Sequence, residues 1–346
     1  MTQTPADPSQ SPAKPQLDVI IIDYNLTTTH MTQTPADPSQ SPAKPQLDVI
    51  IIGAGPAGLT AATYLARYRR QVAVLDAGQS RARWIPTSHN CPGFPFGLEG
   101  DQLLERYRQQ AQKYGVTPTL AHVAKLEKQG DAFTATADDG QSWQAPIVIL
   151  ATGVVDRMPA MQDLVEAIDR QAVRLCAVCD GYEASDTDIA VYAPIDEAIR
   201  HALFMRTYSQ RVTAVPTDDK APDAELARKA AEAGIRVAAP ARAMALVDGG
   251  AQVTGTDDQS HRYDTLYPVL GSDAQSALAL SLGAAHDDND ELDVDDRMQT
   301  TVDGLYAIGD VVSALNQISV AVGHAAIAAT AAHNRLPPNL RMSESA

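Results

Sequence analysis

The chain is poor in cysteine and in basic residues, and each shortage excludes a class of protein. Three cysteines in 346 residues are too few for a disulfide scaffold. Lys and Arg number 27 against 43 Asp and Glu, a net charge of −16, which argues against nucleic-acid binding because that binding depends on basic side chains. No run of about 18 apolar residues is free of charges and turn formers, so no membrane span is predicted. Hydrophobic residues still make up 45% of the chain, enough for buried cores.

The N-terminal region contains a letter-for-letter repeat. Residues 1–22, MTQTPADPSQSPAKPQLDVIII, recur as residues 31–52. Functional repeats drift in sequence, so this identity is typical of an expression or start-site artefact. Both copies open with a Pro-, Ser- and Gln-rich stretch, a composition typical of disorder. Only the second copy runs on into glycines, so we expect residues 1–44 to be a disordered tail and the fold to begin near Leu47.

A glycine-rich loop follows the second copy. A predicted buried strand leads into GAGPAG, residues 53–58, which opens a predicted helix, and a second predicted strand ends at Asp76. A lone G-x-G-x-x-G is weak evidence, but strand, loop, helix and late acid together form the full dinucleotide-binding fingerprint. Gly53 permits the tight turn, Gly55 lets the backbone approach a pyrophosphate, and Gly58 lets the helix pack on the strand. Asp76 is expected to bind ribose hydroxyls.

Four later motifs stand in an order that matches a known family. They are SHNCPGFP with Asn90, IVILATG with Ala151, Thr152 and Gly153, RMQTTVDGLYAIGDV with Gly309 and Asp310, and NQISVAVGHAAIAATAAH with Gln317 and Ile318. Each motif is weak alone. Their order and spacing, together with the glycine loop, resemble the low-molecular-weight thioredoxin reductases over about residues 47–336.

The resemblance implies FAD in the first nucleotide site. In such a protein Asn90 would lie in the loop that meets the flavin, and Asp310 would contact the ribityl or pyrophosphate part of FAD. Gln317 and Ile318, at the start of a helix, would lie nearest the flavin ring. The full set of expected FAD contacts is Gly53, Ala54, Gly55, Pro56, Ala57, Gly58, Asp76, Ala77, Gly78, Asn90, Val123, Ala151, Thr152, Gly153, Gly309, Asp310, Gln317 and Ile318.

The resemblance also implies an architecture. It predicts an α/β fold of two Rossmann-like three-layer domains, with a discontinuous FAD-binding domain over residues 45–156 and 286–336. The insert, residues 157–285, would be a degenerate NAD(P)-binding-like domain that carries the redox cysteines. Residues 337–346 would form a C-terminal tail. A cytoplasmic homodimer is expected.

Cys176 and Cys179 form a C-x-x-C. Without a secretory signal, such a pair in an α/β chain indicates redox chemistry. A zinc site would need a second pair of ligands at similar spacing, which Cys91 and the scattered histidines do not supply, so no metal is expected. Cys91 is interpreted as a packing residue. The resemblance implies that Cys179 lies nearest the flavin, that Cys176 exchanges with the substrate disulfide, and that Asp180 is the general acid/base.

The stretch IAVYAPIDEAIRHALF, residues 189–204, falls where the family has a second glycine loop, for NADPH. Ala193 and Ile195 replace the first two fingerprint glycines, and a side chain at the second would occupy pyrophosphate space. Pro194 removes an N–H donor and Asp196 adds negative charge. The next predicted strand ends in PTDD, residues 216–219, where the family has cations for the 2′-phosphate. We therefore expect no NADPH use.

The sequence thus predicts a thioredoxin-reductase-like flavoprotein that passes electrons between FAD and Cys176–Cys179. Three hypotheses stay open. The first is a reductase of a thioredoxin-like protein disulfide, fed by a donor such as a reduced iron–sulfur protein. The second is a dithiol oxidase that passes electrons from a small dithiol to dioxygen. The third is a flavin redox sensor with negligible turnover, which the intact C-x-x-C-D disfavours.

Overall fold

The computed structural model describes residues 46–312 and 315–341. The duplicated N-terminal segment, and with it the predicted tail over residues 1–44, lies outside the described residues. Of the predicted C-terminal tail, residues 337–341 are described and form no helix or strand.

A parallel sheet forms the centre of the first layered body. Five strands lie in the order β17-β7-β1-β2-β3, and every neighbouring pair is parallel. Four-residue β1 is buried along its whole length because both faces of the sheet are covered. The strands are β1 (Val49–Ile52), β2 (Val72–Asp76), β3 (Thr119–Leu120), β7 (Ile147–Leu150) and β17 (Leu305–Ala307).

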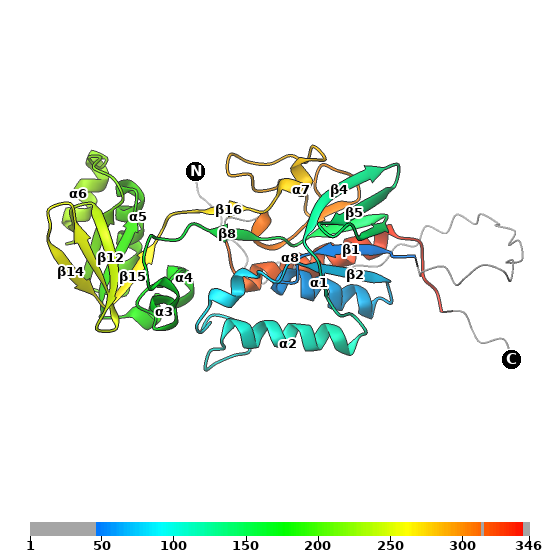
Figure 1. Cartoon of the computed structure of the whole chain (residues 1–346), viewed down its shortest axis with the longest axis horizontal. Coiled ribbons are helices and arrows are strands. Elements are labelled where there is room, and N and C mark those ends of the chain that lie inside the picture. Colours follow the sequence, from blue (N-terminus) through cyan, green and yellow to red (C-terminus); the bar gives the residue numbers. More distant parts are fainter. Residues whose placement is uncertain (1–45, 313–314, 342–346) are drawn as a thin grey trace, which may run out of the picture. The chain divides into compact units, whose positions relative to one another are not determined.

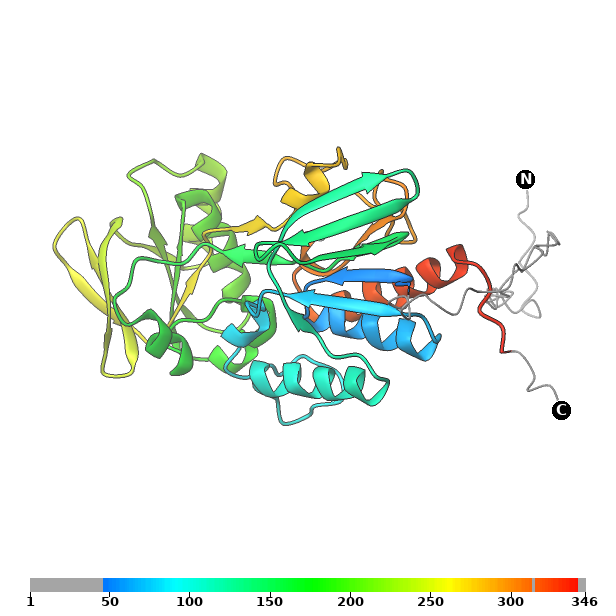
Figure 2. The ribbon, with the colours of Figure 1, turned by 45° about the vertical axis from the view of Figure 1, so that its right-hand side comes forward.

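Helices cover one face of this sheet and an antiparallel sheet covers the other (Figure 2). Val49 and Ile51 of β1 pack on the helix side, which includes the Ala-rich helix α8, whereas Ile50 and Ile52 pack on the opposite side. This alternation is the period-2 pattern of a strand buried on both faces. The covering elements are α1 (Pro56–Arg67), α2 (Gly100–Lys113) and α8 (Ile318–Arg335) on one side, and β4 (Val123–Gln129), β5 (Ala132–Ala137) and β6 (Ser142–Ala145) on the other.

The inserted segment repeats the same three-layer plan. Its parallel sheet has the order β11-β10-β9-β15. One face packs on α5 and α6, and the other on the antiparallel strands β12 to β14 and on α3. These elements are drawn green to yellow in Figure 1. They are α3 (Leu164–Asp169), β9 (Asp188–Ala193), α5 (Ile195–Met205), β10 (Arg211–Pro216), α6 (Ala224–Glu232), β11 (Arg236–Val237), β12 (Ala241–Val247), β13 (Gly250–Gly255), β14 (Ser260–Tyr263) and β15 (Thr265–Pro268).

The insert leaves and re-enters the first body through one antiparallel strand pair. Strand β8 (Val154–Asp156) pairs with β16 (Ser272–Ala274). The next helix, α7 (Ala277–Leu280), packs its residue Ala279 into the core of the first sheet. We therefore propose that the insert ends near β16 rather than at residue 285, because side chains after β16 bury against the first sheet. The predicted α/β class with parallel sheets is confirmed.

Candidate active site

The glycine loop joins β1 to α1 in a turn with no space for side chains. Gly53 has a φ of +104°, and a Cβ there would lie 2.3 Å from the carbonyl oxygen of Ala151. A Cβ on Gly58 would lie 1.9 Å from the carbonyl oxygen of Gly53, so only glycine lets the helix pack this close to the strand end. Gly55 is the N-cap of α1, and a helix N-terminus attracts phosphate.

Asp76 ends β2 beside this loop. Its Oδ1 accepts a hydrogen bond from the backbone N–H of Ala54 at 3.0 Å. The carboxylate therefore braces the loop, and its remaining lone pairs can accept the hydroxyls of a ribose.

A cavity of about 550 Å³ opens over the loop. That volume lies within the range of cofactor pockets, and the glycine loop, the helix N-terminus and the Asp76 carboxylate are groups that a dinucleotide requires. The residues present thus fit FAD. All of the predicted FAD contacts except Gly58 and Gly78 line this cavity. Gly58 packs beneath the loop against Gly53, and Gly78 lies near the side chain of Leu120.

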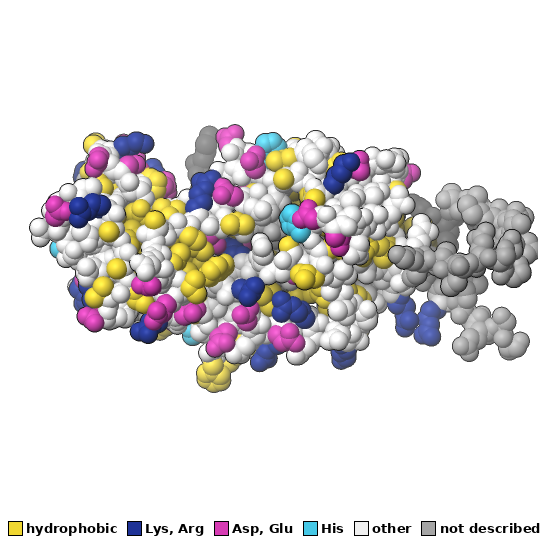
Figure 3. All heavy atoms as spheres, in the orientation of Figure 1, with side chains coloured by type: hydrophobic (Ala, Val, Ile, Leu, Met, Phe, Trp, Pro, Cys, Tyr) yellow, Lys and Arg dark blue, Asp and Glu magenta, His cyan; other side chains and the backbone are white. Residues whose placement is uncertain are grey.

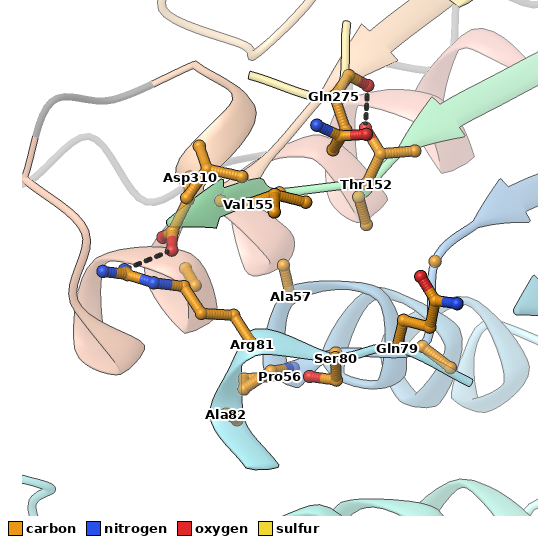
Figure 4. Close-up of a pocket in the computed structure, with 18 of the residues that line it drawn as sticks. Pro56, Ala57, Gln79, Ser80, Arg81, Ala82, Thr152, Val155, Gln275 and Asp310 are labelled. Atoms are coloured by element: carbon orange, nitrogen blue, oxygen red, sulfur yellow. Dashed lines mark hydrogen bonds and ion pairs between the residues drawn. The ribbon is translucent and has the colours of Figure 1, made fainter. Parts of the chain in front are cut away.

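A charged cluster at the cavity wall escaped the sequence analysis. Arg81, in the short 3₁₀ helix η1 (Arg81–Trp84), pairs with both oxygens of Asp156 at 2.6 and 2.8 Å. Its third nitrogen lies 3.2 Å from Asp310 Oδ2 (Figure 4). Burial raises the pKa of Asp310, and the Arg81 guanidinium opposes that rise. The only sequence signal was a cation shortly after β2, because its partners lie 75 and 229 residues away.

Cys176 and Cys179 are joined by a disulfide at the start of α4 (Ala177–Asp180). The sulfur of Cys176 accepts a hydrogen bond from the backbone N–H of Cys179 at 3.2 Å. The side-chain amide of Gln317 lies against both sulfurs, with Nε2 at 3.5 Å from Cys176 Sγ and 3.4 Å from Cys179 Sγ. Both cysteines line the 550 Å³ cavity, so the disulfide and the glycine loop face the same space.

A second cavity, of about 470 Å³, also meets the disulfide. Cys176 lines both cavities, whereas Cys179 lines only the first. The second cavity is walled by apolar side chains such as Val178 and Phe204, which are 54% and 41% exposed. Arg200 and His201 of α5 also line it. Cys176 is therefore accessible from two cavities, whereas Cys179 is accessible from the first of the two.

Asp180 lies outside the described linings of both cavities. Its Oδ1 accepts a hydrogen bond from the Tyr267 hydroxyl at 3.0 Å, and its Oδ2 lies 3.3 Å from Arg174 Nη1. Burial raises the pKa of Asp180, while Arg174 and the Tyr267 hydroxyl oppose the rise. Glu183, which lies 3.7 Å from His89, adds to the rise.

Packed side chains fill the turn between β9 and α5. Pro194 is the N-cap of α5, and Ile195 is 4% exposed within the core of the insert. Asp196 Oδ1 accepts a hydrogen bond from the backbone N–H of Asp223 at 2.9 Å. Asp196 and Glu197 both occupy the first turn of the helix. The strand, turn and helix predicted over residues 189–204 are confirmed.

Several smaller expectations concern residues away from the disulfide. Cys91 is a free thiol, 8% exposed, that packs with Leu98 and Leu103. Within residues 46–312 and 315–341, no group of His, Cys, Asp and Glu could hold a metal ion. No helix among the same residues has the length and apolarity needed to cross a membrane. On the face drawn in Figure 3, basic and acidic side chains are intermixed.

Comparison with known proteins places these features in a family. Residues 47–325 match the family described as pyridine nucleotide-disulphide oxidoreductase. A thioredoxin reductase of Mycolicibacterium smegmatis is 29% identical over 75% of this chain and 87% of its own length. A thioredoxin reductase of Streptomyces clavuligerus is 30% identical over 75% of this chain and 84% of its own length.

Solved structures give the same result. The crystal structure of thioredoxin reductase from Streptococcus pyogenes matches with a TM-score of 0.76 and 28% identity, over 83% of this chain and 97% of that one. The crystal structure of HlmI matches with a TM-score of 0.79 and 26% identity, over 84% and 93%.

Proposed function

The chain belongs to the pyridine nucleotide-disulphide oxidoreductase family as a thioredoxin-reductase-like FAD disulfide oxidoreductase, and on that premise we propose that it works without NADPH. Electrons pass between the flavin, the Cys176–Cys179 pair and the disulfide of a thioredoxin-like protein. The observation that carries the proposal is the pairing of an intact redox disulfide at the first nucleotide site with a closed turn at the second.

FAD, when bound, would supply a carrier of two electrons. We propose that the loop from Gly53 to Gly58 and the α1 N-terminus hold its pyrophosphate and that Asp76 holds a ribose. Asp310 and Arg81 would contribute opposite charges at the cavity wall. The remaining predicted contacts are assigned to FAD in the same way, and most of them line the cavity.

Cys176 is proposed as the cysteine that exchanges with substrate, because it lines the second cavity as well as the first. A substrate thiolate attacks Cys176 Sγ, the bond to Cys179 breaks, and Cys179 leaves as a thiolate that lines the 550 Å³ cavity. The second substrate thiol then displaces Cys176, which gives a substrate disulfide and a reduced cysteine pair. The reverse sequence reduces a substrate disulfide.

Asp180 is proposed as the group that exchanges protons with this cysteine pair. Its pKa is raised by burial, which favours a carboxyl that can carry a proton. Asp180 is the last residue of α4, the helix that also contains Cys179, and Arg174 and Tyr267 hold its carboxylate.

The donor is proposed to be something other than NADPH. At the position of the family's NADPH loop, the side chain of Ile195 is buried in the core of the insert. Asp196 and Glu197 place negative charge in the first turn of α5. A helix N-terminus that binds phosphate offers free N–H groups and no acidic side chains. Asp218, two residues after the end of β10, places a carboxylate where the 2′-phosphate would need a cation, and Lys220 Nζ lies 3.9 Å from it.

A thioredoxin-like protein is the proposed partner because the relatives are named thioredoxin reductases. One relative, from Mycobacterium leprae, is named as a bifunctional thioredoxin reductase/thioredoxin. A small dithiol is the second candidate substrate. The observation that favours it is the 470 Å³ volume of the cavity beside Cys176, since pockets of about 300–1,000 Å³ suit small molecules.

Single-cysteine variants test the proposed roles. Cys176→Ser leaves Cys179 as a free thiolate beside oxidised flavin, which should add a long-wavelength absorbance band at neutral pH that disappears on acidification. Cys179→Ser should give little or no band. A band in Cys179→Ser alone would reverse the two roles, and no band in either variant would contradict a disulfide adjacent to the flavin.

A further inference from the structure

Gln317, a predicted flavin contact that lines the large cavity, also places its side-chain amide against the disulfide. It is the N-cap of α8, the helix whose start lines the large cavity. Its Nε2 is 3.4 Å from Cys179 Sγ and 3.5 Å from Cys176 Sγ. Both distances fall within hydrogen-bond reach of sulfur, so one amide group serves two reacting atoms.

Asn90 fixes which end of that amide faces the sulfurs. Its Nδ2 donates a hydrogen bond to Gln317 Oε1 at 2.8 Å. A carbonyl oxygen accepts and an NH₂ group donates, so this bond keeps Nε2 as the end of the Gln317 amide nearer to the sulfurs, while Oε1 lies 3.8 Å from Cys179 Sγ. Ser88 Oγ lies 3.4 Å from Asn90 Oδ1 and holds the asparagine in turn.

The hydrogen bonds from the Gln317 amide to the two sulfurs become stronger when the disulfide opens. A disulfide sulfur is a weak acceptor, whereas a thiolate carries a full charge, and hydrogen bonds to charged groups are roughly twice as strong as neutral ones. The donors therefore stabilise the reduced pair more than the oxidised pair. An interaction that strengthens as charge develops accelerates the step and shifts its equilibrium.

Resting on the proposed function, we propose that Gln317 is a catalytic residue of disulfide exchange, whose side-chain amide holds the departing thiolate, and that Asn90 is the residue that positions it. When a substrate thiolate attacks Cys176 Sγ, the electron pair of the broken S–S bond moves to Cys179 Sγ, 3.4 Å from Gln317 Nε2. The second substrate thiol closes the substrate disulfide and releases Cys176. Two electrons have then moved from substrate to enzyme. The two substrate protons go to the enzyme thiols, or to solvent for each sulfur that stays a thiolate.

Because the Gln317 amide stabilises the thiolate, we predict that the Cys176–Cys179 disulfide is easier to reduce with this amide than without it. Gln317→Leu keeps similar volume but has no donor, so the reduced pair loses its support. One charge-assisted hydrogen bond corresponds to about a tenfold change in equilibrium constant. For this two-electron couple, tenfold is about 30 mV toward more negative potential. Gln317→Glu should shift it further, because a carboxylate repels a thiolate.

The test uses the flavin-loaded protein, equilibrated without oxygen in mixtures of reduced and oxidised dithiothreitol. Acid quenching, thiol alkylation and mass measurement give the fraction of Cys176–Cys179 reduced, and visible absorbance of the same samples gives the fraction of flavin reduced. We expect Gln317→Leu to need about tenfold more reducing mixtures to open the disulfide. Asn90→Ala, which keeps Gln317, should shift the midpoint in the same direction by less. Gln109→Leu, on the exposed face of α2, is the matched control and should match wild type.

Two outcomes would overturn the inference, and they differ from failure of the proposed function. If Gln317→Leu changes flavin content or the flavin midpoint while the thiol midpoint stays at the wild-type value, the amide serves the flavin alone. If Asn90→Ala and Gln317→Leu both leave the thiol midpoint unchanged, neither residue supports the thiolate. A wild-type disulfide that no dithiothreitol ratio opens would instead contradict the proposed function, and the role of Gln317 with it.

Discussion

At the scale of single residues, the balance of forces on Asp180 sets when it can carry a proton. Its side chain is 16% exposed and that of Arg174 is 11% exposed, so the pair is largely shielded from solvent. Burial favours the protonated carboxyl, whereas the Arg174 cation and the Tyr267 hydroxyl favour the carboxylate. Burial is the larger effect, and the pKa of Asp180 is raised.

Arg174→Gln should raise the pKa of Asp180 further, because the variant removes the cation that favours the ionised form. If Asp180 carries the proton of disulfide exchange, the pH midpoint of that exchange should rise with it. The measurement is the rate of anaerobic flavin reduction by dithiothreitol across the acid and neutral range. Asp180→Asn should abolish the part of the pH dependence of the rate that is due to the titration of Asp180.

Arg236→Gln is the control for the arginine change. Arg236 donates a hydrogen bond to the hydroxyl of Tyr263 in the same insert, and it lines neither of the two cavities that meet the disulfide. Its replacement should leave the midpoint of exchange where it is in wild type. An Arg174→Gln profile that overlays the wild-type profile would mean that Asp180 is not the proton carrier.

At the scale of elements, the turn between β9 and α5 buries a side chain at the position where we propose that a nucleotide-binding glycine is missing. Ile195 is 4% exposed and lies in one cluster with Val191 and Ile199. Ile195→Ala should therefore lower the free energy of unfolding by about 2–5 kcal/mol, through lost burial and the cavity left behind. Equilibrium unfolding in urea measures it. Ile327→Ala, at a position 44% exposed on α8, should change stability by less than about 0.5 kcal/mol. Similar small losses at both positions would contradict a packing role for Ile195.

The ends of α1 and α8 carry a pH-sensitive contact. Arg70, just after α1, donates to His333 Nδ1 and to the His333 carbonyl oxygen, both at 3.0 Å. Burial lowers the pKa of His333, and the nearby Arg70 cation lowers it further. The neutral imidazole is thus the form that the folded protein favours.

The sign of the resulting pH dependence follows from this lowered pKa. His333 contributes stability that is present above its unfolded pKa of about 6.5 and is lost as pH falls through its folded pKa. Wild type should therefore lose melting temperature from about pH 7 to about pH 5, and His333→Asn should lose less over the same range. Thermal unfolding at the two pH values measures the difference. Equal losses of melting temperature in both proteins would contradict this account, because they would show that His333 has the same pKa in the folded and the unfolded state.

Local sequence patterns were sufficient to predict the helices and strands, but they did not predict which distant residues contact one another. The glycine loop, the strand and helix over residues 189–204 and the helix after Gln317 all have periodicity or caps within one segment. Asp310 was predicted as an FAD contact, but Arg81 and its ion pairs with Asp156 and Asp310 were missed because an ion pair across 75 or 229 residues leaves no local pattern. Asp180 was predicted as a site residue from its neighbour Cys179, but its contact with Tyr267 depends on how β15 meets α4. The sequence predicted the end of the insert at residue 285, and our proposal of an earlier end near β16 depends on a long-range contact, the burial of α7 against a distant sheet.

At the scale of the whole molecule, segments far apart in sequence meet at one cavity. The loop at residues 53–58, the disulfide at residues 176–179 and the start of α8 all line it, and no comparable loop opens at the second strand–turn–helix. Each charge-assisted hydrogen bond to phosphate contributes about 1.5–3 kcal/mol. If the second site lacks two phosphate-binding cations, as we propose, it forfeits about 3–6 kcal/mol, on the order of 10²–10⁴ in affinity for NADPH. Ile195 and the acidic first turn of α5 add to that loss.

The most direct test of this account is the visible absorbance of the bound flavin, without oxygen, after addition of NADPH, NADH or dithiothreitol. We predict that neither nicotinamide nucleotide bleaches the flavin even at concentrations of about 1 mM, since the loss above weakens a micromolar site to millimolar or beyond. Dithiothreitol should bleach it readily in wild type and fail in Cys176→Ser. Rapid stoichiometric bleaching by NADPH would contradict the central claim, because it would require a working second nucleotide site.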